Sequence, residues 1–510
     1  MFVMFTPRSF FRERMSPVLA SPAGYAALVL ALDLPVPLPR RLTCVSPKNQ
    51  RMKEEGVSVV PRSNWPGEGT VDHLVFALKY EGVNLLVLRK VFAAIGTDEL
   101  CDYILSTPTG QYARRLWFLY EFLTGEPLPV PDAVTMNTVL VLDTTLHLAP
   151  EKGETSLRHR VVDNLPGSVD FCPIVYRTGR IEHFLALDLT ERTRDLVETT
   201  PPEVLHRAAA FMMLADSKAS FEIEGETSSR DRMQRWAKVI GEAGKGILDD
   251  ERLLDLQKIV IPDTRFIEKM GFRDEGGFVG QHAADGTPRP EHISARPEDL
   301  DTLMQGLHSF ARLAEGRGLD PVADAACQAF GFVYAHPFED GNGRIHRFIM
   351  HHVLARRGFT PPGIVLPISA VMLERVIEYR NVLRTVSEAI LPFIDYSVTA
   401  KHNIRVTSDS IDLYRYFDAT PHVEFLFDCV HHTLEEELPA ELSFLQYRDA
   451  FHAAIGELVD MPERTIDLMI RFLRQNHGSL SRRARAKEFA ALTDEEAGEV
   501  EDAYARIFTP

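Results

Sequence analysis

Residues 336–347 read HPFEDGNGRIHR, and the interpretation of the whole chain starts from this stretch. It joins a histidine, a carboxylate at Asp340, a turn at Gly341-Asn342-Gly343 and two arginines three residues apart. Apolar residues then recur at helical spacing up to Leu354, and Gly358 follows two further arginines as a stop signal. The stretch therefore predicts a loop that opens a helix.

The residue types around this turn suit a polyphosphate and a proton acceptor. A helix start presents unpaired N–H groups and a positive dipole end, and glycines let the backbone approach an anion closely. Arg344 and Arg347 lie on one helical face, and the guanidinium fork matches phosphate oxygens. Asp340 is an oxygen ligand of the kind that Mg²⁺ takes together with phosphates, and His336 can accept a proton near neutral pH.

These residues resemble the Fic-domain signature HxFx(D/E)GNGRxxR, in which every fixed position is filled. A signature with this many fixed positions is far more specific than a lone glycine loop. The resemblance implies a mainly α-helical Fic-type bundle with a small β-hairpin flap, and protein adenylyltransferase activity. The matching residues are His336, Phe338, Asp340, Gly341, Asn342, Gly343, Arg344 and Arg347.

The resemblance also implies roles for the residues around the turn. ATP would lie with its phosphates over Gly341–Arg344, where Asn342 and Arg344 contact phosphate oxygens and Gly343 leaves room for them. Asp340 would hold Mg²⁺, or Mn²⁺, on those phosphates, and Arg347 would hold the γ-phosphate.

His336 would act as the general base, taking the proton of a target serine, threonine or tyrosine hydroxyl. Phe338 would pack inward and fix the loop. In VIEYRNVL, Tyr379 resembles one of the family's paired tyrosines near the adenine, and Arg380 stands where the second would be.

A second motif precedes the signature. Thr200-Pro201-Pro202-Glu203 combines a capping box with prolines in the first turn, which predicts a helix start. Near its end SFEIEG, with Ser220, Glu224 and Gly225, resembles the inhibitory (S/T)xxxE(G/N) motif of class II Fic proteins. The physical hypothesis is that the Glu224 carboxylate neutralises Arg347 and fills the space of the γ-phosphate.

Other functions stay open on the sequence. The same site could remove AMP from a modified protein, with Glu224 aligning a water. Fic proteins also transfer UMP or phosphocholine, so the nucleotide needs a direct test. A different class is a DNA-binding regulator whose Fic core only senses a nucleotide. The expected partner is a hydroxyl-bearing target protein, and self-modification and a homodimer are left open.

The composition limits the partners and the cellular compartment that we expect for this protein. Among 510 residues the formal net charge is -17, which argues against broad nucleic-acid affinity. The 5 cysteines are scattered, without a CxxC or Cys/His cluster, so neither a disulfide framework nor a zinc site is indicated. We expect a cytoplasmic protein without a membrane partner, because the apolar run Tyr25–Leu32 is too short to span a bilayer. We interpret that run as a packed helix rather than a signal peptide.

The chain divides by pattern into four parts. We predict an α-rich N-terminal domain with some strand at 1–190, an inhibitory helix at 200–225, the Fic core at 226–400 and a winged-helix-like module at 405–510. In the N-terminal domain, Ser46–Gly67 is interpreted as a linker or long loop and Thr138–Leu146 as a strand.

Two further segments carry expectations of their own. Phe278–Gly280 and His292–Ser294 are predicted to pair as the flap, which would hold a target segment by strand addition. The basic residues Arg482, Arg483, Arg485 and Lys487 are interpreted as a solvated helix face, with contact to DNA as the alternative.

Overall fold

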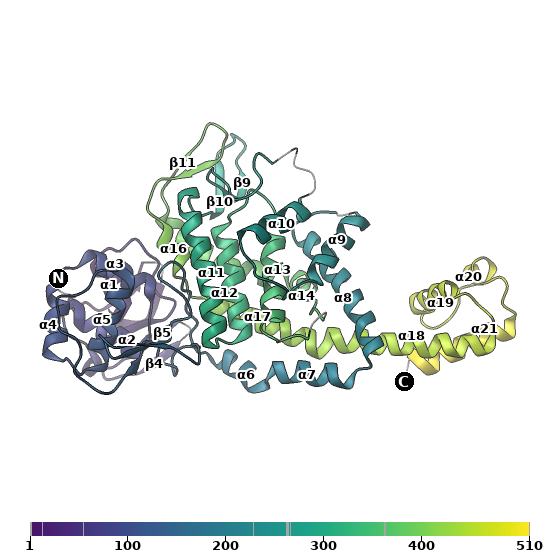
Figure 1. Cartoon of the computed structure of the whole chain (residues 1–510), viewed down its shortest axis with the longest axis horizontal. Helices are drawn as coiled ribbons and strands as arrows, with labels where there is room; N and C mark the ends of the chain where they lie inside the picture. The colour runs from purple at the N-terminus through teal and green to yellow at the C-terminus, as the bar shows by residue number, and fades with distance from the viewer. Residues whose placement is uncertain are drawn as a thin grey trace.

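The computed structural model describes residues 3–12, 14–54, 56–227, 229–261, 265, 267–361 and 364–508. These residues form a mainly helical structure with small sheets, as predicted. Figure 1 shows an N-terminal body beside a central helical core, and one long helix that leads from beneath the core to a separate C-terminal group of helices. Within the described part of the chain, no helix combines the length and apolarity needed to cross a membrane.

The N-terminal body combines five helices with a five-stranded sheet in the order β1-β2-β3-β5-β4, and α1 and α2 pack against that sheet. The apolar run predicted as a helix is α1, whose side chains from Tyr25 to Val29 are buried. The helices are α1 (Gly24–Ala31), α2 (Thr70–Tyr80), α3 (Leu85–Ala94), α4 (Asp98–Ser106) and α5 (Gln111–Thr124). The strands are β1 (Arg8–Phe11), β2 (Arg14–Ala23), β3 (Leu42–Val45), β4 (Met52–Glu54) and β5 (Val57–Val60).

The predicted linker at Ser46–Gly67 is wrong over its central part. β5 runs parallel to β3, with Val57 opposite Leu42, and β4 pairs antiparallel with β5 at the sheet edge. Val57 and Val59 are buried, so the short alternation in Val57–Val60 marks a real strand. The polar residues of the neighbouring β4 made this strand hard to recognise from the sequence, because an edge strand keeps charged side chains in solvent.

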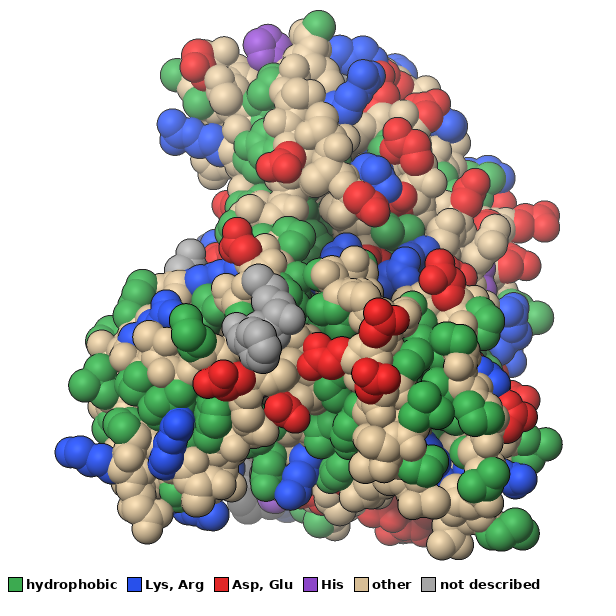
Figure 2. Space-filling model, turned by 90° about the vertical axis from the view of Figure 1, so that its left-hand side faces the viewer, with side chains coloured by type: hydrophobic (Ala, Val, Ile, Leu, Met, Phe, Trp, Pro, Cys, Tyr) green, Lys and Arg blue, Asp and Glu red, His purple; other side chains and the backbone are tan. Residues whose placement is uncertain are grey.

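The predicted strand at Thr138–Leu146 is confirmed only at β6 (Val139–Leu140). The chain then turns, because the Asp143 carboxylate accepts the backbone N–H of Thr145 at 2.9 Å. β6 joins a three-stranded sheet with β8 (Val161–Asp163) and β7 (Glu154–Ser156). Figure 2 shows the face at this end of the molecule, where hydrophobic side chains are interspersed with charged ones of both signs.

The central core is built around two buried helices: α12 ends just before the HPFEDGNGRIHR stretch, and α13 begins within it. Asp320 caps α12, accepting the backbone N–H groups of Val322 and Ala323. The surrounding helices are α6 (Gly179–Leu187), α7 (Leu189–Thr199), α8 (Pro202–Ile223), α9 (Arg230–Ile240), α10 (Asp250–Val260), α11 (Leu300–Arg317), α12 (Pro321–Ala335), α13 (Asn342–Arg356), α14 (Ile368–Glu374) and α15 (Val376–Ile390).

Two hairpins lie above this core. The predicted flap is confirmed as an antiparallel pair of β9 (Phe278–His282) and β10 (Pro288–Ile293), in which Ile293 lies opposite Phe278. A second hairpin, which was not predicted, pairs β11 (Tyr396–Val398) with β12 (Ile404–Val406). The two lie side by side in Figure 1.

The C-terminal part begins later than the predicted boundary at residue 405. α16 (Ile411–Arg415) and α17 (Thr420–His432) belong to the main hydrophobic core, in which Val423 and Leu426 are fully buried. A separate small core starts within α18 and includes Phe451, Ile470 and Val500. The helices beyond α17 are α18 (Leu438–Leu458), α19 (Glu463–Gln475), α20 (Arg482–Ala486) and α21 (Asp494–Phe508).

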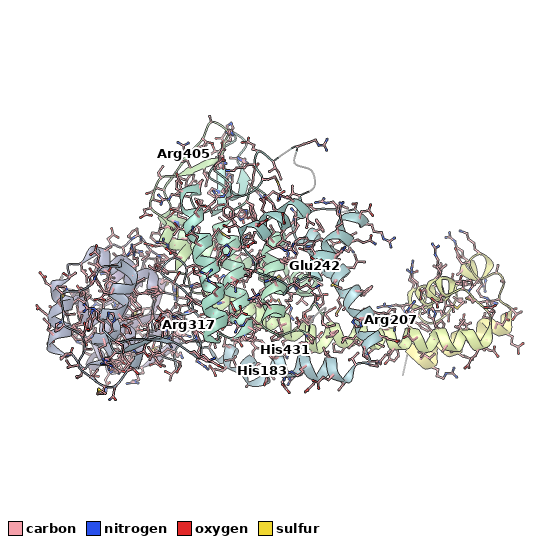
Figure 3. The ribbon with its side chains drawn as sticks, viewed as in Figure 1. His183, Arg207, Glu242, Arg317, Arg405 and His431 are labelled. Atoms are coloured by element: carbon pink, nitrogen blue, oxygen red, sulfur yellow. The ribbon has the colours of Figure 1, made fainter. Side chains whose placement is uncertain are left out.

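The helical character of this C-terminal module is confirmed, but residues 407–508, all described, contain no strand element that could form a wing. The basic residues at 482–487 fall on and beside α20, and Arg485 forms an ion pair with Asp494 at 2.5 Å. α18 also contacts α8, since the Arg207 guanidinium donates to the Asp449 carboxylate at 2.8 Å (Figure 3).

α8 is held to the core by a buried carboxylate. Asp216 is fully buried and accepts hydrogen bonds from His351 of α13 at 2.9 Å and from the backbone N–H of Ser369 of α14 at 2.6 Å. The Ser369 hydroxyl donates to the same carboxylate at 2.8 Å. One side chain therefore fixes α8 against two other helices.

Asp216→Ala should lower the free energy of unfolding by about 3 kcal/mol, because it leaves buried hydrogen-bond donors of two helices without an acceptor. Ser369→Ala removes one hydroxyl bond and should cost about 1 kcal/mol. Chemical denaturation of both variants measures the difference. Equal losses would contradict the assigned role of Asp216.

Candidate active site

The loop between α12 and α13 is closed by its own side chains. Asn342 is buried; its Oδ1 accepts the backbone N–H of Phe338 at 3.0 Å and its Nδ2 donates to the Phe338 carbonyl at 2.8 Å. The Phe338 ring is 1% exposed and packs against Phe272 and Phe332. Gly341 has φ 98°, a left-handed conformation that favours glycine. The Asn342 side chain thus braces the loop, and its predicted contact with phosphate stays a prediction.

His336 ends α12 in a left-handed conformation, with φ 50° and ψ 59°. Its Nδ1 lies 3.1 Å from the Val333 carbonyl, which can only accept, so Nδ1 carries the proton and Nε2 is left as the acceptor. Burial, reinforced by the nearby charge of Arg273, lowers the pKa of His336 to about 4. The imidazole is therefore neutral at neutral pH, the form a general base needs.

Both arginines of the motif are 1% exposed and lie at the start of α13. Arg347 donates from Nε to the Ser220 hydroxyl at 3.0 Å and from Nη2 to the Ser220 carbonyl at 2.7 Å. The same Nη2 donates to the Glu224 carboxylate at 2.8 Å. Arg344 lies 2.8 Å from the carboxylate of Glu226. The end of α8 therefore meets both guanidinium groups.

Glu224 lies directly over the turn. A Cβ atom built on Gly343 would come within 2.1 Å of the Glu224 Oε1, so the carboxylate occupies space that only glycine leaves free at this position. Burial by itself raises the pKa of Glu224, but the charges and hydrogen bond of Arg347 outweigh it and the pKa is lowered. Glu224 is thus an anion resting on the loop, at the end of α8 where Gly225 turns the chain with φ 72°.

Asp340 is more than half exposed, and its Oδ1 accepts the backbone N–H of Gly341 at 2.6 Å and lies 3.3 Å from Arg344. A single solvent-facing carboxylate beside an anion site fits Mg²⁺, which binds through one or two carboxylates together with substrate phosphates and waters. Among the described residues, the one grouping of three histidine or carboxylate ligands lies elsewhere, at Glu374, His432 and Glu437.

A cavity of about 290 Å³ opens beside the loop and brings together His336, Glu224, Gly343 and Tyr379. Tyr379 is buried, stacks on the ring of His346 and lies against the Arg347 guanidinium. Its predicted place near the adenine stays a prediction, because the structure puts its hydroxyl beside the arginine assigned to phosphate. Arg380 lines the same cavity.

Two residues of this site were missed by the sequence reasoning. Glu226 pairs with Arg344, and the only signal for it was a carboxylate two positions beyond Glu224. Arg273 is 8% exposed and donates from Nε to the His336 carbonyl at 2.8 Å, which fixes the backbone of the histidine. It lies 63 residues before His336, and no local pattern marked it.

Comparisons with known proteins find similar sequences around this site. Residues 247–354 match the sequence profile of the Fic/DOC family. The "Protein adenylyltransferase Fic" of Nematostella vectensis is 38% identical over 118 residues, which are 23% of this chain and 25% of that protein. The protein of the same name from Drosophila mojavensis is 29% identical over 163 residues, which are 32% of this chain and 28% of that protein. The chain thus spans about a quarter of the length of these curated relatives.

Solved structures of this family were also found. A Fic family protein from Desulfovibrio desulfuricans has 20% identity and a TM-score of 0.38, covering 55% of this chain and 80% of that one. A Fic-domain-containing signaling protein from Bacteroides thetaiotaomicron has 21% identity and a TM-score of 0.36, covering 52% and 97%. The family match and the named relatives identify a Fic domain in this chain. The match at 247–354 contains the complete signature, whereas α8 and Glu224 lie before it.

The ionisation of His336 can be measured directly. NMR titration of its imidazole should give a midpoint near pH 4, well below the ordinary value of 6.5. Because the unfolded chain takes up this proton from about pH 6.5 downward and the folded chain only near pH 4, this residue lowers stability as the pH falls through that window. Glu224→Gln should lower the midpoint further, since the Glu224 charge raises it. A midpoint at or above 6.5 would contradict the half-buried, neutral imidazole described above.

Proposed function

We propose that this protein is an adenylyltransferase that moves AMP from ATP to a hydroxyl group of a target protein. The observation that carries the proposal is the neutral imidazole of His336, which bonds through Nδ1 and leaves Nε2 as an acceptor, in a residue that lines the same cavity as Gly343 at the start of α13. The names of the relatives matched over the Fic domain point to the same chemistry.

In the proposed reaction, Nε2 of His336 takes the proton of the target hydroxyl as its oxygen attacks the α-phosphorus. The bond from that phosphorus to the bridging oxygen breaks, and pyrophosphate leaves. Backbone N–H groups at the start of α13 and the Arg344 guanidinium hold the phosphates. Asp340 would bind Mg²⁺ or Mn²⁺, which when bound neutralises phosphate charge. A positioned general base is worth roughly 10²–10⁴-fold in rate, and placement and charge neutralisation add to it.

We further propose that Glu224 keeps the site inhibited. Its carboxylate uses the Arg347 guanidinium that a γ-phosphate would need, and it lies over Gly343 where phosphate oxygens would approach. A charge-assisted hydrogen bond contributes about 1.5–3 kcal/mol, enough to change the population of a nucleotide pose about tenfold or more. Release then requires the end of α8 to move or Glu224 to leave Arg347.

His336→Ala should reduce transfer of AMP by about 10²–10⁴-fold while ATP binding, measured by calorimetry, stays within about twofold. His183→Ala removes an exposed imidazole on α6 and should behave as the parent (Figure 3). Retention of full activity by His336→Ala would remove the basis of the proposal.

Glu224→Gly should increase self-modification with radiolabelled ATP about tenfold or more, because it frees Arg347. Glu222→Gly is the matched control: it lies in the same turn but pairs with Lys218 instead of Arg347. If the Glu224 variant is no more active than the Glu222 variant, with either Mg²⁺ or Mn²⁺, the inhibitory role is wrong.

Removal of AMP is the second candidate, favoured by one observation. Glu224 and His336 line the same cavity, so a carboxylate and an imidazole face the space where a water could attack a modified side chain. The self-modified Glu224→Gly protein serves as substrate. Release of AMP on adding the parent protein, but not on adding Glu224→Gly, supports this activity, and a stable modification excludes it.

A further inference from the structure

His336 lies between two cavities, of which the function proposed above uses only one. The first is the cavity of about 290 Å³ that also contains Glu224 and Gly343. The second, of about 370 Å³, is lined by His336 and Phe338, and among the described residues His336 alone lines both cavities. One residue, His336, therefore lines two separate spaces.

The flap separates these spaces. Phe278 and His282 of β9 line the second cavity, whereas Val279 lines the first. This is the alternation expected of a strand, whose successive side chains point to opposite faces. The flap is thus a partition with one face toward the Glu224 side and the other toward the second cavity.

The β11–β12 hairpin forms the outer wall of the second cavity. His402 and Asn403, in the turn of this hairpin, line it. The His282 Nε2 donates to the His402 carbonyl at 2.9 Å, and the Asn403 side chain donates to the Gly276 carbonyl at 2.8 Å. A Cβ atom on Gly276 would lie 2.1 Å from the Ile404 carbonyl, so the wall is closely packed.

The walls of the second cavity carry an excess of negative charge. Its lining includes the carboxylates of Glu268, Asp274, Glu275 and Glu339, against two lysines, Lys269 and Lys401. Lys401 is shared between Glu268 at 2.8 Å and Glu275 at 2.9 Å, and Lys269 pairs with Asp274 at 3.0 Å.

The remaining cation of this lining is Arg273, which is buried. Its guanidinium donates to the backbone carbonyls of His336 and Glu275, both at 2.8 Å. That charge is engaged by the backbone rather than presented at the rim, so the rim itself is acidic.

We infer that the second cavity receives the hydroxyl-bearing segment of the target protein and selects segments with lysine or arginine beside the acceptor hydroxyl. The inference rests on the adenylyltransferase activity proposed above. With ATP in the first cavity, a hydroxyl entering from the second meets Nε2 of His336 from the other face of the flap. The carboxylates of Glu268 and Glu275 then lie where the neighbouring residues of the target would pass.

The test uses the full-length Glu224→Gly protein and synthetic peptides that carry one serine, threonine or tyrosine in an alanine background. Each hydroxyl is flanked on both sides by lysine, by glutamate or by alanine. Lysine-flanked peptides should accept AMP about fivefold or more faster than glutamate-flanked ones, the factor that about 1 kcal/mol of charge pairing supplies.

Adding both Glu268→Lys and Glu275→Lys should make the glutamate-flanked peptides the faster substrates. The less disruptive pair Glu268→Gln and Glu275→Gln should make the rates of lysine-flanked and glutamate-flanked peptides similar. Glu203→Lys with Asp301→Lys makes the same change in net charge outside the cavity and should keep the original order. ATP affinity should be equal in all variants.

The same ratio of lysine- to glutamate-flanked rates in every variant would overturn the inference. So would failure to modify any peptide by protein that still modifies itself, because a cavity open to His336 should admit a short segment. Absence of AMP transfer to every acceptor, the protein itself included, would instead contradict the proposed function.

Discussion

The hydrogen bonds of the Arg347 guanidinium to the end of α8 are the contact on which this site depends. A guanidinium with 1% exposure needs partners, and the Ser220 carbonyl, the Ser220 hydroxyl and the Glu224 carboxylate supply them. Any anion that binds Arg347 must therefore compete with the protein's own carboxylate. The strength of that competition sets how readily the loop accepts a polyphosphate.

This contact is supported from further along the same helix. Asp216 fixes α8 to α13 and α14 about one turn before Ser220, and Arg207 links the first turns of α8 to α18. α18 in turn carries the separate core of the C-terminal module. The position of Glu224 thus depends on the buried contacts of Asp216 and on the exposed ion pair between Arg207 and Asp449. The exposed ion pair is the weaker of the two.

The sequence was sufficient for three local patterns. The helix after Gly341, the helix that begins at Pro202 and the flap around Phe278 follow from spacing, proline positions and turn residues, and the structure contains them. The sequence was insufficient where two interacting residues lie far apart in the chain. Arg273 and Glu226 contact the motif residues His336 and Arg344 only in the folded structure. β4 was missed because the pattern of an exposed, charged edge strand is also typical of a linker, and β5 because its alternation covers only the short run Val57–Val60. The local motif was also insufficient at Asn342. This residue is expected at the phosphates, but its side-chain amide forms hydrogen bonds with the backbone of Phe338.

The most direct measurement is a crystal structure of Glu224→Gly with Mg²⁺ and a non-reactive ATP analogue. The account predicts the γ-phosphate on the Arg347 guanidinium, the remaining phosphates over Gly341–Arg344, and the α-phosphorus facing Nε2 of His336 across the base of the flap. A nucleotide bound elsewhere, or with its α-phosphorus on the side of the loop away from His336, would contradict it.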